Sequence, residues 1–297
     1  MVKIHKNIEV VIPSVKFSKG LGCLNKKLIK QNTIKNIKTR ADFMSKKYAI
    51  LYCMIALITD FGTADPYVGI VKAVILSVEK NVEIIDITHE IDPFDILKGA
   101  FYLESAYRYF PKETIFMGVI DPGVGSSRTP IACKYRDYFF VGPMNGLFDM
   151  VFEEKPYCVD ISNHPYILKP TSSTFHGRDI FAPACAYIHK FKSIEFLGPK
   201  IDYVYHLDIP KPLLKDNTIE GKILFYDKFG NAITNVRCKS IKYAIIDDKK
   251  VEYFEYFSKA PKQSPGITCG SFGYLEFFIN QGSFKDFTSA RDFTLIL

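Results

Sequence analysis

After an initial basic segment the chain alternates between short apolar strands and amphipathic helices, and this alternation constrains the fold more than any other feature. The apolar run Ile55–Thr59 predicts a strand, and Pro66–Val78 predicts a helix because its apolar residues recur at helical spacing. A second strand is expected at Glu83–Thr88, a second helix at Asp95–Phe110 and a third strand at Thr114–Ile120. Strands that alternate with helices form a mostly parallel sheet with helices on its faces. The sequence therefore predicts an αβα sandwich.

The last third of the chain has a different pattern. Two prolines one residue apart in Ile209–Pro212 neither continue a helix nor pair within a sheet, so this segment suggests a hinge. Short strand-like runs separated by turn residues follow it, with no obvious helix. A helix near Asp179–His189 completes the first part. We predict an α/β domain over residues 54–211 and a smaller all-β barrel domain over residues 212–297.

The positive charge of the chain lies almost entirely in its first 53 residues. These hold 12 basic and 2 acidic residues, whereas residues 54–297 hold 27 basic and 30 acidic ones. A nucleic-acid-binding face on the folded body is therefore not expected. We interpret residues 1–53 as a basic N-terminal extension that is dispensable or a misassigned start. The competing interpretation is an arm that touches an anionic surface.

The cysteines and the longest apolar run bear on where the protein works. The run Tyr48–Thr59 is too short to span a bilayer and is not followed by a cleavage site, so no membrane or export role is indicated. The seven cysteines are scattered, with no Cys-x-x-Cys pair and no histidine spacing typical of zinc sites. We therefore expect reduced thiols in a cytoplasmic protein without a metal.

Ligands of an open α/β sheet bind beyond the carboxyl ends of its strands, so polar residues at those ends are the candidates. Asp60 follows the first strand; its carboxylate suits a ribose diol, and equally suits the cap of a turn. Asp121 and Arg128 flank a Gly-x-Gly turn after the third strand. This turn lacks the third glycine of the dinucleotide fingerprint and the Gly-Lys-Ser/Thr of a phosphate loop. Taken singly, this pair and His176 are no more than a structural ion pair and a polar side chain.

Taken together, five motifs resemble the S-adenosylmethionine hydroxide adenosyltransferases, the water-using relatives of fluorinase and chlorinase. In chain order they are Thr59-Asp60-Phe61-Gly62, Asp65-Pro66-Tyr67-Val68-Gly69, Val119-Ile120-Asp121-Pro122-Gly123-Val124-Gly125, Ser173-Thr174-Phe175-His176-Gly177-Arg178-Asp179 and Phe229-Gly230-Asn231. The motifs are in register across both predicted domains, over roughly residues 54–297. This order makes the resemblance specific.

The resemblance implies an enzyme that hydrolyses S-adenosyl-L-methionine to adenosine and L-methionine, by in-line attack of an activated water on the ribose C5′. It implies a catalytic trio of Asp121, Arg128 and His176, and no cofactor. The implied substrate contacts are Asp60 for the ribose hydroxyls, Phe94 and Phe175 for the nucleoside, Asp65, Asp227 and Ser271 for the methionine end, and Asn231 for adenine. It also implies a homotrimer whose sites lie between the first domain of one subunit and the β domain of the next.

Two positions depart from the family pattern, and two other functions stay open. Met144 stands where many relatives carry Asp or Asn, and Phe272 where the halogenases carry an arginine that grips the methionine carboxylate. One alternative is a non-catalytic protein that binds adenosine or S-adenosylmethionine, which would gain nothing from the trio. The other is a halide-using adenosyltransferase, which is disfavoured because the carboxylate of Asp121 repels an anion. The expected partner is a small-molecule substrate, with neither nucleic acid nor membrane.

Overall fold

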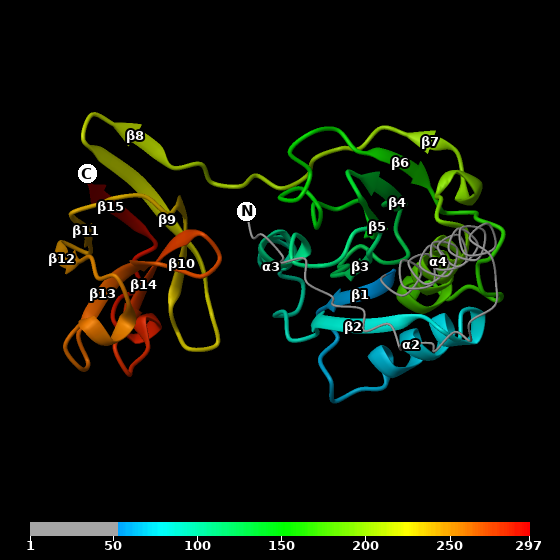
Figure 1. Ribbon diagram of the computed structural model, residues 1–297, viewed down its shortest axis with the longest axis horizontal. Coiled ribbons are helices and arrows are strands. Elements are labelled where there is room, and N and C mark those ends of the chain that lie inside the picture. Colours follow the sequence, from blue (N-terminus) through cyan, green and yellow to red (C-terminus); the bar gives the residue numbers. More distant parts are fainter. Residues whose placement is uncertain (1–52) are drawn as a thin grey trace, which may run out of the picture. The chain divides into compact units, whose positions relative to one another are not determined.

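The first part of the chain folds around a seven-stranded mixed sheet (Figure 1). The computed structural model describes residues 53–297. The strands lie in the order β2-β1-β3-β5-β4-β6-β7; the first four are parallel to one another, and the remaining neighbours pair antiparallel. The strands are β1 (Met54–Thr59), β2 (Glu83–Thr88), β3 (Ile115–Val119), β4 (Pro130–Tyr135), β5 (Tyr138–Pro143), β6 (Tyr157–Asp160) and β7 (Lys200–Ile201).

Helices cover both faces of this sheet. Ile55 and Leu57 of β1 belong to the core beneath α2 and α4, whereas Ala56 and Ile58 belong to the core beneath α3. Because both faces of β1 are buried, its first five residues are all apolar instead of alternating with polar ones. The predicted αβα architecture is confirmed. The helices are α2 (Tyr67–Val78), α3 (Ile96–Tyr107) and α4 (Ala182–Phe191), with a π-helical turn at Gly177–Phe181 leading into α4.

The second sheet is antiparallel and curls into a nearly closed barrel, which confirms the all-β character predicted for the last third. Its order is β12-β11-β15-β9-β10-β14-β13, with β8 paired to β9. The edges approach each other where Tyr253, next after β12, bridges to Ile267 of β13. The strands are β8 (Leu213–Lys215), β9 (Thr218–Tyr226), β10 (Ala232–Arg237), β11 (Tyr243–Ile246), β12 (Lys249–Glu252), β13 (Pro265–Cys269), β14 (Tyr274–Ile279) and β15 (Asp292–Ile296).

The described residues belong to one compact unit. Phe101 of α3 packs against Phe225 and Tyr274 of the second sheet, with ring centroids 5.1 Å and 4.8 Å apart. The domain boundary between residues 211 and 212 stays a prediction. The proposed N-terminal extension lies, apart from Cys53, outside the described residues. Over residues 53–297, no helix combines the length and the apolar character that a bilayer crossing requires.

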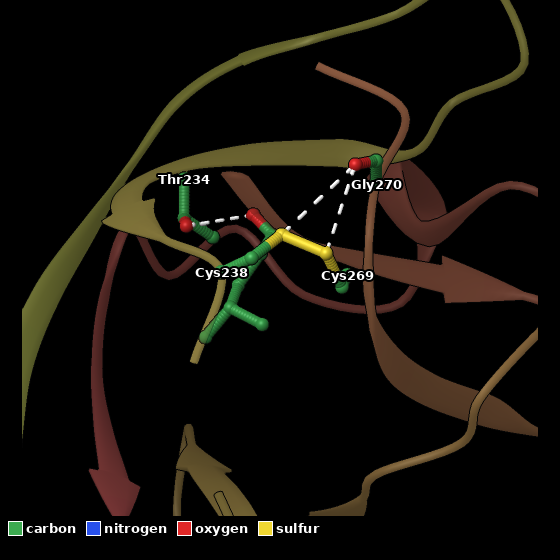
Figure 2. Close-up of a disulfide and its surroundings, with 5 residues drawn as sticks. Thr234, Cys238, Cys269 and Gly270 are labelled. Atoms are coloured by element: carbon green, nitrogen blue, oxygen red, sulfur yellow. Dashed lines mark hydrogen bonds between the residues drawn. A yellow bond between two sulfur atoms is a disulfide. The ribbon is translucent and has the colours of Figure 1, made fainter. Parts of the chain in front are cut away.

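Two disulfides correct the expectation of reduced thiols. Cys133 and Cys158 face each other across the antiparallel strands β4 and β6 and are bonded. Cys238, next after β10, is bonded to Cys269 at the end of β13, and the Gly270 carbonyl oxygen lies within 4.0 Å of both sulfurs (Figure 2). The sequence did not predict these pairs because the cysteines are far apart along the chain. Strand pairing brings them together.

Candidate active site

The three residues of the predicted catalytic trio form one hydrogen-bonded chain. Asp121 lies two residues beyond β3, at the carboxyl end of the sheet. Nε of Arg128 donates to both carboxylate oxygens of Asp121, at 2.9 Å and 3.0 Å, and Nη2 of Arg128 also donates to Asp121. The same Nη2 lies 2.8 Å from Nδ1 of His176. The side chains of Asp121 and Arg128 are only 4% and 10% exposed, so bulk water screens this chain weakly.

The geometry fixes the protonation of His176. A guanidinium can only donate, so Nδ1 of His176 accepts and a neutral ring carries its proton on Nε2. Burial, together with the charge of Arg128, lowers the pKa of His176 below its usual 6.5. His176 is therefore neutral at neutral pH.

One donor of Arg128 remains unused. Among residues 53–297, no group accepts a hydrogen bond from Nη1 of Arg128, although this nitrogen is buried. A buried unpaired donor is costly and usually points to a missing partner such as a ligand or water. Both carboxylate oxygens of Asp121, by contrast, accept hydrogen bonds from the arginine. No group of three potential metal ligands occurs in the described part of the chain.

The turn that carries Asp121 and Arg128 meets the loop before His176 at Gly125. Gly125 has a φ of +77°, in the left-handed region that favours glycine. A Cβ atom there would lie 2.2 Å from the carbonyl oxygen of Ser173. The absence of a side chain at this position thus allows the two segments to touch.

A cavity of about 560 Å³ opens beside the trio. Predicted site residues in its lining are Asp60, Phe94, Asp121, Phe175 and His176. The volume is in the range of small-molecule sites, and aromatic side chains dominate one wall. The structure therefore brings together five of the ten predicted site residues around one space, with Arg128 directly behind them.

Asp60 is held at the edge of this cavity. The main-chain N–H of Phe94 donates to Oδ2 of Asp60 at 3.0 Å. Burial raises the pKa of Asp60 above its usual 3.8, and the charge of Asp121 adds to the rise. Phe94 itself is 67% exposed and has a φ of +69°, which is rare for a residue with a large side chain. An aromatic ring is thus presented to solvent by a strained backbone, an arrangement typical of binding sites.

The aromatic wall contains two residues that sequence reasoning did not single out. Phe61, Tyr67 and Phe175 contact one another, with ring centroids 5.3 Å to 6.0 Å apart. Phe61 and Tyr67 both belong to the motifs quoted above, so their position beside Asp60 and Asp65 was the available signal. Together the three rings offer an apolar surface for a flat heterocycle.

The other predicted site residues do not line this cavity. Asp65 is exposed at the start of the segment before α2. Oδ1 of Asp227 accepts the main-chain N–H groups of Phe229 and Asn231, and its Oδ2 accepts the side-chain amide of Asn231. Ser271 lines a different cavity of about 220 Å³. Apart from Asp65, the residues predicted for the methionine end and for adenine thus lie in turns of the second sheet.

The two departures from the family pattern have plain structural settings. Met144 packs against the core beneath α3, and its main-chain N–H donates to the Thr129 carbonyl oxygen. Phe272 packs against the rings of Phe101 and Tyr102. Arg237 lines the cavity of Ser271 and Phe272, so a guanidinium is close to this loop from β10.

Comparisons with known proteins find similar sequences and a similar structure. The model of the SAM hydroxide adenosyltransferase N-terminal domain matches residues 55–198, and that of the C-terminal domain matches residues 221–292. The chain is 32% identical over 244 residues to the (R)-S-adenosyl-L-methionine hydrolase of Thermus thermophilus, covering 77% of this chain and 92% of the relative. It is 38% identical over 201 residues to the enzyme of that name from Methanocaldococcus jannaschii, covering 65% and 71%. A crystal structure of a conserved protein from Thermotoga maritima superposes with a TM-score of 0.76 at 32% identity, covering 82% of this chain and all of the other.

Proposed function

Because the chain belongs to the SAM hydroxide adenosyltransferase family, we propose that it is a hydrolase that splits S-adenosyl-L-methionine into adenosine and L-methionine. The observation that carries the proposal is the Asp121–Arg128–His176 chain at the wall of an aromatic cavity, with one buried donor of Arg128 unused. The names of the relatives specify the R configuration at sulfur, and we extend that preference to this chain as part of the proposal.

The reaction needs an oriented nucleophile more than an acid. A sulfonium leaves as a neutral thioether, so the sulfur requires no proton. Water attacks C5′ as the C5′–S bond breaks; one water proton stays on the new 5′-hydroxyl and the other is released. Holding water in line at about 3–3.5 Å in a desolvated pocket can supply roughly 7–11 kcal/mol of the barrier.

Arg128 is proposed to stabilise hydroxide character on this water through Nη1. Such stabilisation is strong in a site that excludes solvent. Asp121 spends both of its oxygens on Arg128 and therefore orients the guanidinium. His176 accepts from Arg128 at Nδ1 and carries its proton at Nε2, so neither nitrogen is available as a base. We assign His176 to orienting the arginine and, through Nε2, the water or the ribose oxygen.

The rest of the site is proposed to come from two copies of the chain. Asp60 would accept the ribose hydroxyls, and Phe94 and Phe175 would flank the nucleoside. Asp65, Asp227 and Ser271 would engage methionine, and Asn231 adenine. A homotrimer supplies these groups together, because the residues of the second sheet do not line the cavity of the trio in the same chain.

Two further properties belong to the proposal. Activity is expected to persist in a chelator, because the chemistry requires no metal. We also propose a cytoplasmic location, for which the two disulfides are the critical test, since such bonds are rare in cytosolic proteins. Cell fractionation with thiol labelling tests both statements about location and redox state.

The test of function is turnover of each sulfur epimer of S-adenosylmethionine by the purified full-length chain, with products separated by chromatography. Adenosine and methionine are expected, the R epimer is consumed faster, and oxygen-18 from labelled water enters the 5′-hydroxyl. Binding without turnover would support a non-catalytic binding protein. A 5′-halogenated product in the presence of chloride or fluoride would support the halide alternative, and methylthioadenosine would refute the assignment.

A further inference from the structure

A second cluster of polar side chains contacts the loop that carries Asp60 and has no place in the mechanism above. His89 follows β2 directly and is 4% exposed. Its Nδ1 lies 2.7 Å from Oγ1 of Thr59, the last residue of β1. Its Nε2 lies 3.1 Å from Oδ1 of Asp86, but without the geometry of a hydrogen bond. Oδ2 of Asp86 accepts from Nζ of Lys72 on α2 at 2.6 Å.

The order Thr59–His89–Asp86 has the composition of a nucleophile, a base and an orienting acid, yet it is not a hydrolytic centre. Thr59 is 2% exposed and is not part of the cavity lining. Its Oγ1 also accepts the main-chain N–H of Phe61 at 3.2 Å. A hydroxyl that no substrate can reach, and that is already bonded on two sides, serves the structure of the loop around it.

The contacts of His89 converge on the loop that carries Asp60. Through Thr59 the imidazole is linked to the N–H of Phe61, and the main-chain carbonyl of His89 accepts the N–H of Gly62 at 2.8 Å. From the other side, the N–H of Phe94 donates to the carboxylate of Asp60. His89 thus fixes residues 59–62 through both its side chain and its main chain, and Asp60 lies between these two attachments.

The charges are consistent with this bonding. Burial alone would raise the pKa of Asp86, but the hydrogen bond from Lys72 and the proximity of His89 outweigh burial and hold its pKa below the usual 3.8. Asp86 is then an anion at neutral pH, next to the Nε2 side of the ring. A neutral ring therefore carries its proton on Nε2, and the Thr59 hydroxyl donates to Nδ1. This leaves the Thr59 oxygen lone pairs for the N–H of Phe61.

We infer that His89 is a positioning residue: acting through Thr59, it orients the carboxylate of Asp60 toward the two hydroxyls of a ribose, with Asp86 and Lys72 orienting the ring. The inference rests on the proposed function only in taking Asp60 as the acceptor of the diol. Substitutions that break the Thr59–His89–Asp86 contacts are therefore expected to lower the affinity for ligands that carry a ribose diol. The affinity for ligands that lack a diol should stay unchanged.

The experiment compares two ligands and a set of matched variants by calorimetry on the full chain. Adenosine carries the diol and 2′,3′-dideoxyadenosine lacks it. Thr59→Val removes the hydroxyl at nearly constant shape, Thr59→Ser keeps it, and Thr114→Val is the control. Thr114 is similarly buried, donates its hydroxyl in one hydrogen bond, and lies next before the opposite end of the neighbouring strand β3.

We expect Thr59→Val to lower the affinity for adenosine about tenfold, the usual scale for a lost buried hydrogen bond. The affinity for dideoxyadenosine should stay unchanged. Thr59→Ser should restore most of the loss, and Thr114→Val should change neither ligand. His89→Asn, whose amide can replace Nδ1, should keep more adenosine affinity than His89→Gln, whose amide replaces Nε2. These two variants supply the answer if Thr59→Val does not fold.

Two results would overturn the inference. One is an equal loss of affinity for adenosine and for dideoxyadenosine. The other is a ratio of these two affinities that stays at the wild-type value in both Thr59→Val and His89→Gln. Asp60→Ala should abolish the preference for adenosine, and if it does not, His89 has no diol acceptor to position. Because binding is read out, these outcomes are separate from the turnover assay: a chain that fails to release adenosine from S-adenosylmethionine refutes the hydrolase proposal and leaves the binding comparison intact.

Discussion

The two sheets of the molecule hold their functional side chains in different ways. Around the mixed sheet, the key groups are bonded to one another before any ligand arrives, as in the chain from Asp121 through Arg128 to His176. In the antiparallel sheet, Asp227 is bonded to its own turn, and Ser271 is exposed in a loop. Under the proposed function, we infer that the first region carries the chemistry and the second contacts the substrate. Their variants should therefore fail in different ways.

The largest expected effect is on the chemistry of the first region. Arg128→Ala should lower kcat about 10²–10³-fold, or roughly 2.7–4 kcal/mol, with a smaller change in KM, because its donor acts mainly as charge develops. Arg128→Lys keeps the charge but loses the planar fork and should recover only part. Steady-state kinetics on S-adenosylmethionine measure this. The control is Arg136→Ala, which removes an exposed arginine paired with Glu153. An unchanged kcat in Arg128→Ala would contradict the assignment of the chemistry to the region around the mixed sheet.

The second effect concerns the stability of the contact region. Cys238 and Cys269 are 31 residues apart, and closing a loop of that length stabilises a fold by about 3–4 kcal/mol in the chain-entropy description. The double variant Cys238→Ser/Cys269→Ser should lose that amount in urea unfolding while kcat stays close to normal. Reductant should shift the unfolding midpoint of the wild type more than that of the variant. Identical midpoints for the wild type with and without reductant would speak against a formed bond.

The third effect is a pH dependence in the same region. Burial, with a contribution from the charge of Asp227, raises the pKa of Glu276 from 4.5 to about 7. The unfolded chain then gives up this proton at lower pH than the folded chain. The free energy of unfolding should therefore fall by about 3 kcal/mol as the pH rises from about 4.5 to about 7.

Glu276→Gln should remove this slope, and Glu252→Gln, an exposed change on the same sheet, should preserve it. Urea unfolding at several pH values provides the measurement. A wild-type slope that survives in Glu276→Gln would assign the titration to another group.

The smallest effect separates the two halves of the substrate. Asp60→Ala should lose roughly 1.5–3 kcal/mol of adenosine affinity, the usual range for hydrogen bonds to a charged group, and little methionine affinity. Asp227→Ala should lose methionine affinity, with an added loss of stability because its turn loses three hydrogen bonds. Calorimetric titration with each product provides the comparison. If each variant loses both products equally, the two regions do not divide the substrate.

The fold was largely predictable because its strongest elements are periodic. Strand β1 and helix α2 lie within one residue of their expected bounds, and α3 begins one residue later and ends three residues earlier than expected, since apolar spacing reports burial directly. The short strands β6 and β7 were not foreseen. They join the sheet by antiparallel pairing with distant segments, which leaves no local periodicity. The disulfide between β4 and β6 was missed for the same reason.

The site was predictable only in part from local pattern. Asp121 and Arg128 are seven residues apart around a turn, so their pairing followed from spacing. His176 lies far along the chain and was joined to them by resemblance alone. The sequence predicted a helix near Asp179–His189 with polar residues before it. In the structure a π-helical turn at Gly177–Phe181 precedes the α-helix. Such turns occur often at functional sites, and sequence periodicity does not reveal them.

Gly125 has a consequence for how this protein can change over generations. Any side chain there would separate the Asp121–Arg128 turn from the loop of His176, although neither segment is needed to build the sheet. A substitution at this position would therefore abolish activity while leaving an abundant, well-folded protein. Homologues that have lost catalytic activity but still bind the ligand should carry such a change. A survey of natural variants at position 125 could therefore separate active enzymes from inactive ones.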